Sequence, residues 1–163
     1  MKRLKVYLDT SIINFLFADD SPDFKIVTED FFANFVKPKI YDVFISDVVL
    51  DEIAMTENET KRSQLLKVVQ DYELPFEYFD NEADRLAKIY LNEKVIPEKK
   101  INDARHIGLA TVKSFDILLS WNFKQLANVN RRNKVKIINE KEVNFYPLDL
   151  VTPIQLIYDE DNE

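Results

Sequence analysis

The stretch Lys5-Val6-Tyr7-Leu8-Asp9-Thr10-Ser11 contains a short apolar run that ends in one acid and two hydroxyl residues. Residues 5–8 are typical of a β-strand, because Val, Tyr and Leu follow one another without a polar break. Asp9 comes directly after this predicted strand, and the hydroxyl groups of Thr10 and Ser11 stand beside its carboxylate. The stretch therefore predicts a strand with a polar site at its carboxyl end.

Further predicted strands alternate with predicted helices along the rest of the chain. Strands are expected at residues 43–45, 76–79, 117–120 and 148–151. Helices are expected at 12–17 and 22–35, from 47 to about 55 behind an N-cap at Ser46, at 60–72, 82–93 and 102–113, and in segments up to about 142. Such alternation implies right-handed crossovers and a parallel sheet covered on both faces. The predicted fold is an α/β/α sandwich with a mostly parallel sheet of about five short strands.

The chain is expected to form a single domain at residues 1–155, followed by an acidic tail at 156–163. Its 163 residues suit one compact domain, and neither a linker nor an internal repeat divides them. The basic N-terminus is not followed by an apolar segment near the roughly 20 residues that cross a bilayer. A cytoplasmic protein without membrane contact is therefore expected.

The composition excludes several kinds of functional site. The chain has 22 basic and 29 acidic residues, a net charge of −7, and 46% hydrophobic residues, which excludes a disordered spacer. The single glycine, Gly108, cannot build the glycine-rich loops that hold nucleotide phosphates. There is no Cys and a single His, His106, so a zinc site made of those residues is excluded. Metal chemistry would fall to carboxylates, which suit hard cations such as Mg²⁺ or Mn²⁺.

Three acids fall beyond the carboxyl ends of the predicted strands, where ligands gather in open α/β sheets. Asp9 follows the first strand, and Glu52 lies on the inward stripe of its helix, whereas Asp51 points to solvent. Asp103 opens the helix at 102–113 on its inward side. Each acid has an ordinary alternative: Asp9 caps a helix, Glu52 pairs with a basic side chain, and Asp103 interacts with the helix dipole. Their convergence on one edge favours a joint site.

Other polar and aromatic residues near this edge receive lesser roles. Asn122 follows the fourth strand, where another acid would be expected, and can ligate weakly or hold a water. Asp116 begins that strand, about 13 Å from its far end by strand rise, so a solvent or capping role is expected. His106, one turn from Asp103, is interpreted as a hydrogen-bonded helix residue rather than a general base. Trp121 is expected to pack against the sheet.

The order and spacing of these segments resemble the PIN-domain nucleases, most closely the VapC-like toxin ribonucleases of toxin-antitoxin pairs. The resemblance covers most of the chain. The matching segments are 6–11, 46–53, 102–104, 117–122 and 150–153. Ser120 takes the family's hydroxyl position, whereas Asn122 departs from the pattern, because many members carry a fourth acid there.

The resemblance implies a PIN-like fold and RNA cleavage that depends on Mg²⁺ or Mn²⁺. The expected catalytic and metal-binding residues are Asp9, Glu52 and Asp103, and the expected supporting residues are Thr10, Ser120 and Asn122. Basic side chains are expected to guide the RNA backbone, with a solvated face as the ordinary alternative. These basic residues are Lys124, Arg131 and Arg132.

The expected partners are an RNA substrate and an antitoxin protein. A homodimer or an antitoxin complex is also expected from the aromatic early helices, which contain Phe15, Phe17, Phe31 and Phe32. Two alternatives remain open. A catalytically weak or inactive PIN scaffold would bind RNA or a protein partner without turnover, and the amide of Asn122 is its main support. A phosphatase with Asp9 as nucleophile ranks lower, because Ser11 stands where that family has a second Asp.

Overall fold

The computed structural model describes residues 2–122, 129–143 and 148–158. Its strands are β1 (Lys5–Leu8), β2 (Asp42–Ser46), β3 (Phe76–Glu77), β4 (Ile117–Leu119) and β5 (Asp149–Val151). Its α-helices are α1 (Thr10–Asn14), α2 (Pro22–Phe31), α3 (Asp47–Ala54), α4 (Glu59–Asp71), α5 (Asn81–Asn92), α6 (Ile101–Val112), α7 (Val129–Glu142) and α8 (Pro153–Tyr158). Shorter helical segments are η1 (Phe15–Phe17), η2 (Phe32–Val36) and η3 (Glu98–Lys100).

All five strands pair in parallel, in the order β3-β2-β1-β4-β5. The chain runs outward from β1 through β2 to β3, then returns to the other side of β1 for β4 and β5. β1 is therefore the central strand, and the order in which the chain adds strands to the sheet reverses between β1 and β4. This switch point is where open α/β sheets form their ligand crevices. The prediction of an α/β sandwich with a parallel sheet is confirmed.

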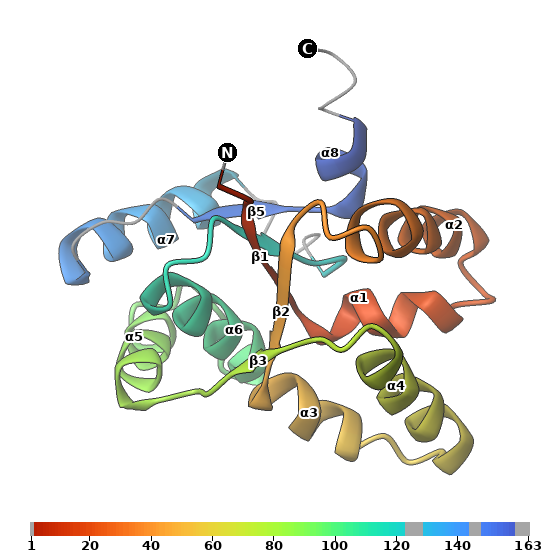
Figure 1. Cartoon of the computed structure of the whole chain (residues 1–163). Helices are drawn as coiled ribbons and strands as arrows, with labels where there is room; N and C mark the ends of the chain where they lie inside the picture. The colour runs from red at the N-terminus through yellow and green to blue at the C-terminus, as the bar shows by residue number, and fades with distance from the viewer. Residues whose placement is uncertain (1, 123–128, 144–147, 159–163) are drawn as a thin grey trace.

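Helices cover both faces of the sheet. Figure 1 shows α5, α6 and α7 on one side and α1, α2 and α4 on the other. The helix α3 lies at the carboxyl edge, where it contacts α1, α4 and α6. Because it touches both helical layers, its residues can meet side chains from either one. Among the described helices, none has the length and apolar character that a membrane crossing requires.

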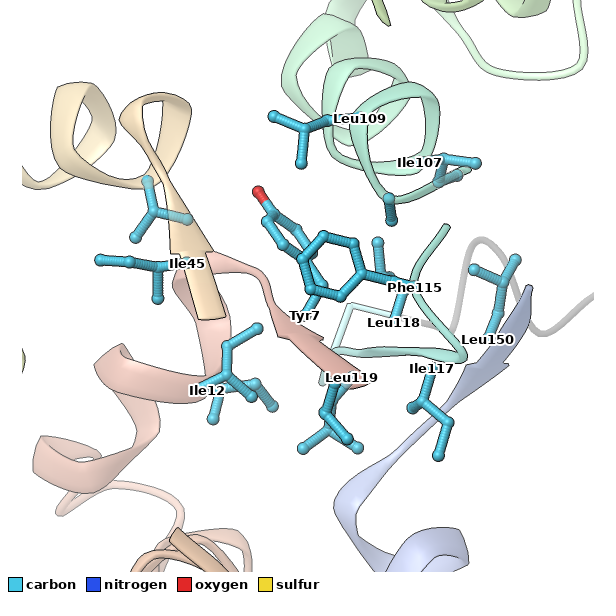
Figure 2. Packing of buried hydrophobic residues seen from close by; sticks show 14 of the residues in the cluster. Tyr7, Ile12, Ile45, Ile107, Leu109, Phe115, Ile117, Leu118, Leu119 and Leu150 are labelled. Carbon is cyan, nitrogen blue, oxygen red and sulfur yellow. The ribbon is translucent and has the colours of Figure 1, made fainter. Parts of the chain in front are cut away.

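The core alternates across the central strands as strand geometry requires. Tyr7 pairs in register with Leu118, and Figure 2 shows both side chains on the α6 side of the sheet together with Phe115. Ile12 and Leu119 lie on the opposite side in the same view. The Tyr7 and Phe115 rings meet edge to face, with their centroids 5.5 Å apart. Tyr7 is fully buried, so packing alone fixes the position of its ring.

Three element expectations differ from the structure. Phe31 and Phe32 are 0% and 1% exposed, so they belong to the core rather than to an exposed aromatic surface for a partner. The strand expected at 76–79 ends at Glu77, because only the last two residues of β2 pair with this edge strand. Residues 156–158 of the predicted tail belong to α8, which packs on α2, and residues 159–163 lie outside the described part of the chain.

Candidate active site

Asp9 stands at the carboxyl end of the central strand and is 4% exposed. Its backbone amide continues the sheet by donating to the Leu119 carbonyl at 3.2 Å. Its side chain caps α1, because Oδ1 accepts from the Ser11 amide at 3.0 Å, and also from the Ser11 hydroxyl. Oδ2 accepts from the Ser120 hydroxyl. Burial raises the pKa of Asp9 to about 6, although the neighbouring His106 and the two hydroxyls act to lower it.

The hydroxyls of Ser11 and Ser120 also accept hydrogen bonds from the backbone that follows β4. The Trp121 amide donates to Ser11 Oγ and the Asn122 amide donates to Ser120 Oγ, each at 2.9 Å. Ser120 is fully buried, whereas Asn122 is exposed. The Trp121 ring packs beside Phe24 of α2, and its indole N–H donates to Thr28 Oγ1 at 2.9 Å. The backbone after β4 is therefore fixed around Asp9, and the Asn122 residue lies at the surface beside it.

Glu52 projects from α3 toward the same edge. Its Oε1 accepts from Thr10 Oγ1 at 2.9 Å and from His106 Nε2 at 2.6 Å. Burial alone would raise the pKa of Glu52, but the hydrogen bonds and charge of His106 and the bond from Thr10 hold it below the usual value. The predicted pairing of Glu52 with a basic side chain therefore exists, and its partner is His106. Asp51, the next residue on the helix, is exposed.

His106 and Tyr7 belong to this arrangement, although neither is expected at the site from the sequence. His106 is 3% exposed, and its Nδ1 lies 2.5 Å from the Tyr7 hydroxyl. The same hydroxyl lies 2.7 Å from Ser46 Oγ. A signal for His106 was present, because it follows Asp103 by three residues and so shares its face of α6. Nothing in the sequence indicates Tyr7, whose partner depends on how α6 packs on the sheet.

Asp103 lies in the first turn of α6 and is half-buried. Its side chain makes no hydrogen bond or ion pair with any residue of the described ranges. Burial raises the pKa of Asp103; the neighbouring His106 and Lys100 act against this rise, and the charge of Glu52 adds to it. Asp103 also contributes to the raised pKa of Asp9. Asp103 is thus close enough to raise the pKa of Asp9 and to have its own pKa raised by Glu52.

The donor set suits a hard cation held by few protein oxygens. No group of three Asp, Glu or His side chains within residues 2–122, 129–143 and 148–158 is close enough to enclose a metal ion. Mg²⁺ commonly keeps several waters and uses only one or two carboxylates. Asp9 and Asp103 fit that requirement, because burial makes the ionised form of each carboxylate costly unless a cation offsets its charge. The side chain of Asp103 also has no hydrogen-bond partner among the described residues that would compete with a cation. Glu52 accepts from Thr10 and His106 at Oε1 and keeps Oε2 without a partner among the described residues, so this oxygen can face the cation or a water.

A cavity of about 420 Å³ adjoins Glu52 on its solvent side. Met55, Phe79 and Arg105 line it along with Glu52. The Arg105 guanidinium lies 5.9 Å from the centre of the Phe79 ring, so a cation and an aromatic face line the same cavity as Glu52.

The basic residues predicted to guide RNA lie elsewhere. Arg131 and Arg132 are on α7, which packs on α5, and Lys124 lies outside the described residues.

Comparison with known proteins places this geometry in a family. The model of the PIN domain family matches residues 6–129. A search of curated proteins returned no match. The solved structure of Mycobacterium tuberculosis VapC20, described as a sarcin-ricin loop cleaving toxin, is similar with a TM-score of 0.58 and 14% identity, over 76% of this chain and 95% of that one.

A second similar structure is VapBC2 from Rickettsia felis, solved bound to a DNA fragment from their promoter. Its TM-score is 0.55 at 15% identity, over 90% of this chain and 97% of that one. At these identities the two structures establish a shared fold. The family model covers most of the chain, including all three acids. The chain therefore belongs to the PIN-domain family.

Proposed function

We propose that the protein is a ribonuclease that depends on Mg²⁺ or Mn²⁺ and acts as the toxin of a toxin-antitoxin pair. The observation that carries the proposal is a buried carboxylate, Asp9, beside a half-buried one, Asp103, with the pKa values of both raised at the switch point of a PIN fold. Two neighbouring acids that resist ionisation are costly to keep in a fold unless a cation offsets their charge. Membership of a nuclease family supplies the reaction class.

In the proposed mechanism Asp9 and Asp103 hold the cation. Ser11 and Ser120 fix both oxygens of Asp9, so this carboxylate needs no reorganisation when it binds. When bound there, such a cation would offset charge on the scissile phosphate and lower the pKa of a water. Glu52 orients that water through Oε2, which has no hydrogen-bond partner among the described residues. A carboxylate with a lowered pKa is ionised and ready to accept a hydrogen bond from water.

RNA is the proposed substrate, an antitoxin protein is the proposed partner, and the cytoplasm is the proposed location of the protein. VapC20 is described as cleaving the sarcin-ricin loop, and VapBC2 pairs a protein of this fold with a second component. Lys100 acts electrostatically on Asp103 and Arg105 lines the cavity beside Glu52, so these side chains are stronger candidates for phosphate contacts than Arg131 or Arg132. A homodimer remains a prediction, which light scattering of the purified protein tests.

The rival is a PIN scaffold that binds RNA with little turnover, and Asn122 is the residue that favours it. An amide at this exposed position leaves the site one carboxylate short of the family's usual four. Binding of RNA without cleavage in the presence of Mn²⁺ would support this rival. The domain prediction of one unit at 1–155 is common to both proposals.

The deciding experiment incubates the purified protein with end-labelled RNA, with Mn²⁺, with Mg²⁺ and with EDTA. We expect cleavage with the metals and none with EDTA. Asp9→Asn is the matched variant, because Asn also caps helices and the fold should survive. Loss of cleavage in Asp9→Asn excludes a contaminating nuclease. Cleavage that persists in EDTA or in the Asp9→Asn protein would overturn the proposal.

A further inference from the structure

We propose that His106 and Tyr7 are positioning residues that hold Glu52 in one orientation at the site. The inference rests on the proposed function, because it takes Glu52 to act on the attacking water. It adds a device behind that carboxylate, built from two buried residues that do not face the substrate. Its observation is a continuous line of polar contacts that joins β2, β1, α6 and α3.

The line begins inside the sheet and ends at the acid. Ser46, at the end of β2, accepts from the Val49 amide at 3.4 Å and lies 2.7 Å from the Tyr7 hydroxyl. Tyr7 in turn lies 2.5 Å from His106 Nδ1, and His106 Nε2 lies 2.6 Å from Glu52 Oε1. Ser46 and Tyr7 are fully buried, and only the Glu52 end reaches solvent. Buried polar groups arranged in this way restrict one another to a single geometry.

The hydrogens of this line can be assigned so that each donor has an acceptor. An ionised Glu52 has no proton to give, so the bond at its Oε1 places a proton on His106 Nε2. In the neutral ring, His106 Nδ1 is then free to accept the Tyr7 hydroxyl proton, and the Tyr7 oxygen accepts the hydroxyl proton of Ser46. In the protonated ring, Nδ1 donates to the Tyr7 oxygen instead, so the contact between the two residues is kept in either charge state. The Val49 amide completes the line by donating to Ser46. The described residues contain no buried side-chain N or O atom without a partner, in agreement with this assignment.

The two carboxylate oxygens of Glu52 therefore differ in their hydrogen-bond partners. Oε1 is occupied by Thr10 and His106, which lie on α1 and α6, so α3 is connected to both helical layers through one atom. Oε2 has no partner among the described residues, and Glu52 lines the cavity of about 420 Å³. A half-exposed glutamate would otherwise sample several rotamers, and a site loses rate when its groups are loosely held. His106 and Tyr7 therefore fix which oxygen faces the reacting water.

The first test observes His106 directly by NMR and needs no activity. Because the chain contains one His, its imidazole ¹⁵N and ¹H signals belong to a single residue. We expect a proton on Nε2 in the wild type, with signals that shift in Tyr7→Phe and in Glu52→Gln. Tyr90→Phe is the matched control, since Tyr90 is also fully buried and its hydroxyl bonds to Asn139, away from the site. Signals indifferent to Tyr7→Phe and Glu52→Gln would overturn the proposal.

The second test separates positioning from a general structural role. Under saturating RNA, Tyr7→Phe should lower kcat by about 10- to 100-fold, the usual effect of removing a group behind a ligand. Its KM for RNA should change by less than about twofold, because Tyr7 is buried. The double variant Tyr7→Phe/Glu52→Gln should be no slower than Glu52→Gln alone, as expected for residues that act as a unit. Tyr90→Phe should keep the wild-type kcat.

The outcomes of the two tests are distinguishable. Losses that multiply in the double variant, or equal losses in Tyr7→Phe and Tyr90→Phe, would overturn the positioning role and leave the ribonuclease proposal intact. If the wild-type protein cleaves no RNA with Mn²⁺, the ribonuclease proposal is overturned. If the His106 signals still shift as expected in the variants, the proposal that His106 and Tyr7 hold Glu52 is supported. His106→Gln provides a second variant if Tyr7→Phe fails to fold.

Discussion

Asp9 performs a structural task and is also the best-placed acid of the site. A capping carboxylate at the surface would have a lowered pKa, because helix amides favour its charged form. Asp9 has the cap, with Oδ1 bonded to the Ser11 amide, and nevertheless has a raised pKa because it is buried. Asp9 is therefore a helix cap, as the alternative interpretation of the sequence predicted. The cap alone does not explain why the carboxylate is buried beside Asp103.

The raised pKa of Asp9 predicts how the stability of the metal-free protein depends on pH. Between its ordinary value of 3.8 and about 6, the folded protein keeps a proton that the unfolded chain has released. Stability should therefore fall as the pH rises through this range, by on the order of 3 kcal/mol from this group, and then level off. Asp9→Asn lacks this contribution, so in EDTA the variant should be more stable than the wild type at pH 7.5, and the two should converge near pH 4.

Urea unfolding at several pH values measures this difference, with Asp51→Asn as the control that should follow the wild-type profile. Asp51 is exposed and lies outside the cluster of buried acids. Parallel profiles for wild type and Asp9→Asn would contradict the assignment of a raised pKa to Asp9.

Glu52 and Asp51 provide a test of helix phase within one pair of neighbours. Glu52→Gln should lower the rate of Mn²⁺-dependent cleavage by roughly 10²- to 10⁴-fold and leave a slow residual rate, because it removes the charge that the Thr10 and His106 bonds maintain. Asp51→Asn should stay within a few-fold of the wild type, since its side chain is exposed. Cleavage rates of the two purified variants measure this, with melting curves to show that both fold. Equal losses in the two would mean that Glu52 has no special role.

Helical periodicity was sufficient to distinguish Glu52 from Asp51, because both lie on a regular helix whose phase the apolar stripe defines. It was also sufficient to place Asp103 on the inward side of α6. Periodicity could not reveal the bond between His106 and Tyr7, whose residues are far apart in the chain. That bond depends on strand register and on how deeply α6 settles on the sheet. The roles assigned to the three acids stay predictions until the variants are assayed.

At the scale of elements, Gly108 sets how closely α6 approaches α5. A Cβ on Gly108 would lie 2.8 Å from the Ala83 carbonyl oxygen and 3.2 Å from the Ala87 amide nitrogen. Both atoms belong to the backbone of α5, so neither can move aside as a flexible side chain would. The glycine is therefore required by a close approach of two helices. This approach matters for the site because α6 carries His106 and Asp103.

Gly108→Ala should destabilise the protein by about 1–3 kcal/mol, the usual cost of overpacking. Helix propensity alone predicts the opposite sign, a gain of roughly 1 kcal/mol for replacing a mid-helix glycine by alanine. A thermal melt therefore decides between packing and propensity, with a fall of several degrees expected. A rise in melting temperature would show that α5 and α6 can separate without cost.

The element predictions succeeded where the chain has strong local signals. Ser46 caps α3 as predicted, with its hydroxyl accepting from the Val49 amide, and the central strands lie within a residue of their predicted bounds. The helix α8 was not predicted, because its six residues form too short a segment for periodicity and follow directly after Thr152. Its stability comes from packing on α2, which local sequence does not describe.

At the scale of the whole molecule, the strand order explains how residues far apart in sequence form one site. The central position of β1 brings Asp9 between β2 and β4, so that Ser120 reaches Asp9 from one side and α3 delivers Glu52 from the other. Asp103 arrives from α6, in the layer on the opposite face from α1. Three acids from three crossovers thus meet at one edge. The fold therefore has to tolerate the repulsion of Asp103 with Asp9 and with Glu52.

This repulsion predicts that a divalent cation stabilises the whole fold. A cation that binds the assembled site but not the unfolded chain adds about 2.7 kcal/mol at a hundredfold excess over its dissociation constant. For a domain of this size, the melting temperature should rise by roughly 5–10 °C when Mn²⁺ is added to protein freed of metal by EDTA. Asp103→Asn should raise the melting temperature of the metal-free protein, since it removes one source of repulsion, and should abolish most of the rise with Mn²⁺. Asp9→Asn should likewise lose the rise, whereas Asp51→Asn should keep it. An equal rise in all four proteins would place the cation elsewhere and leave the buried charges of Asp9 and Asp103 without a counterion.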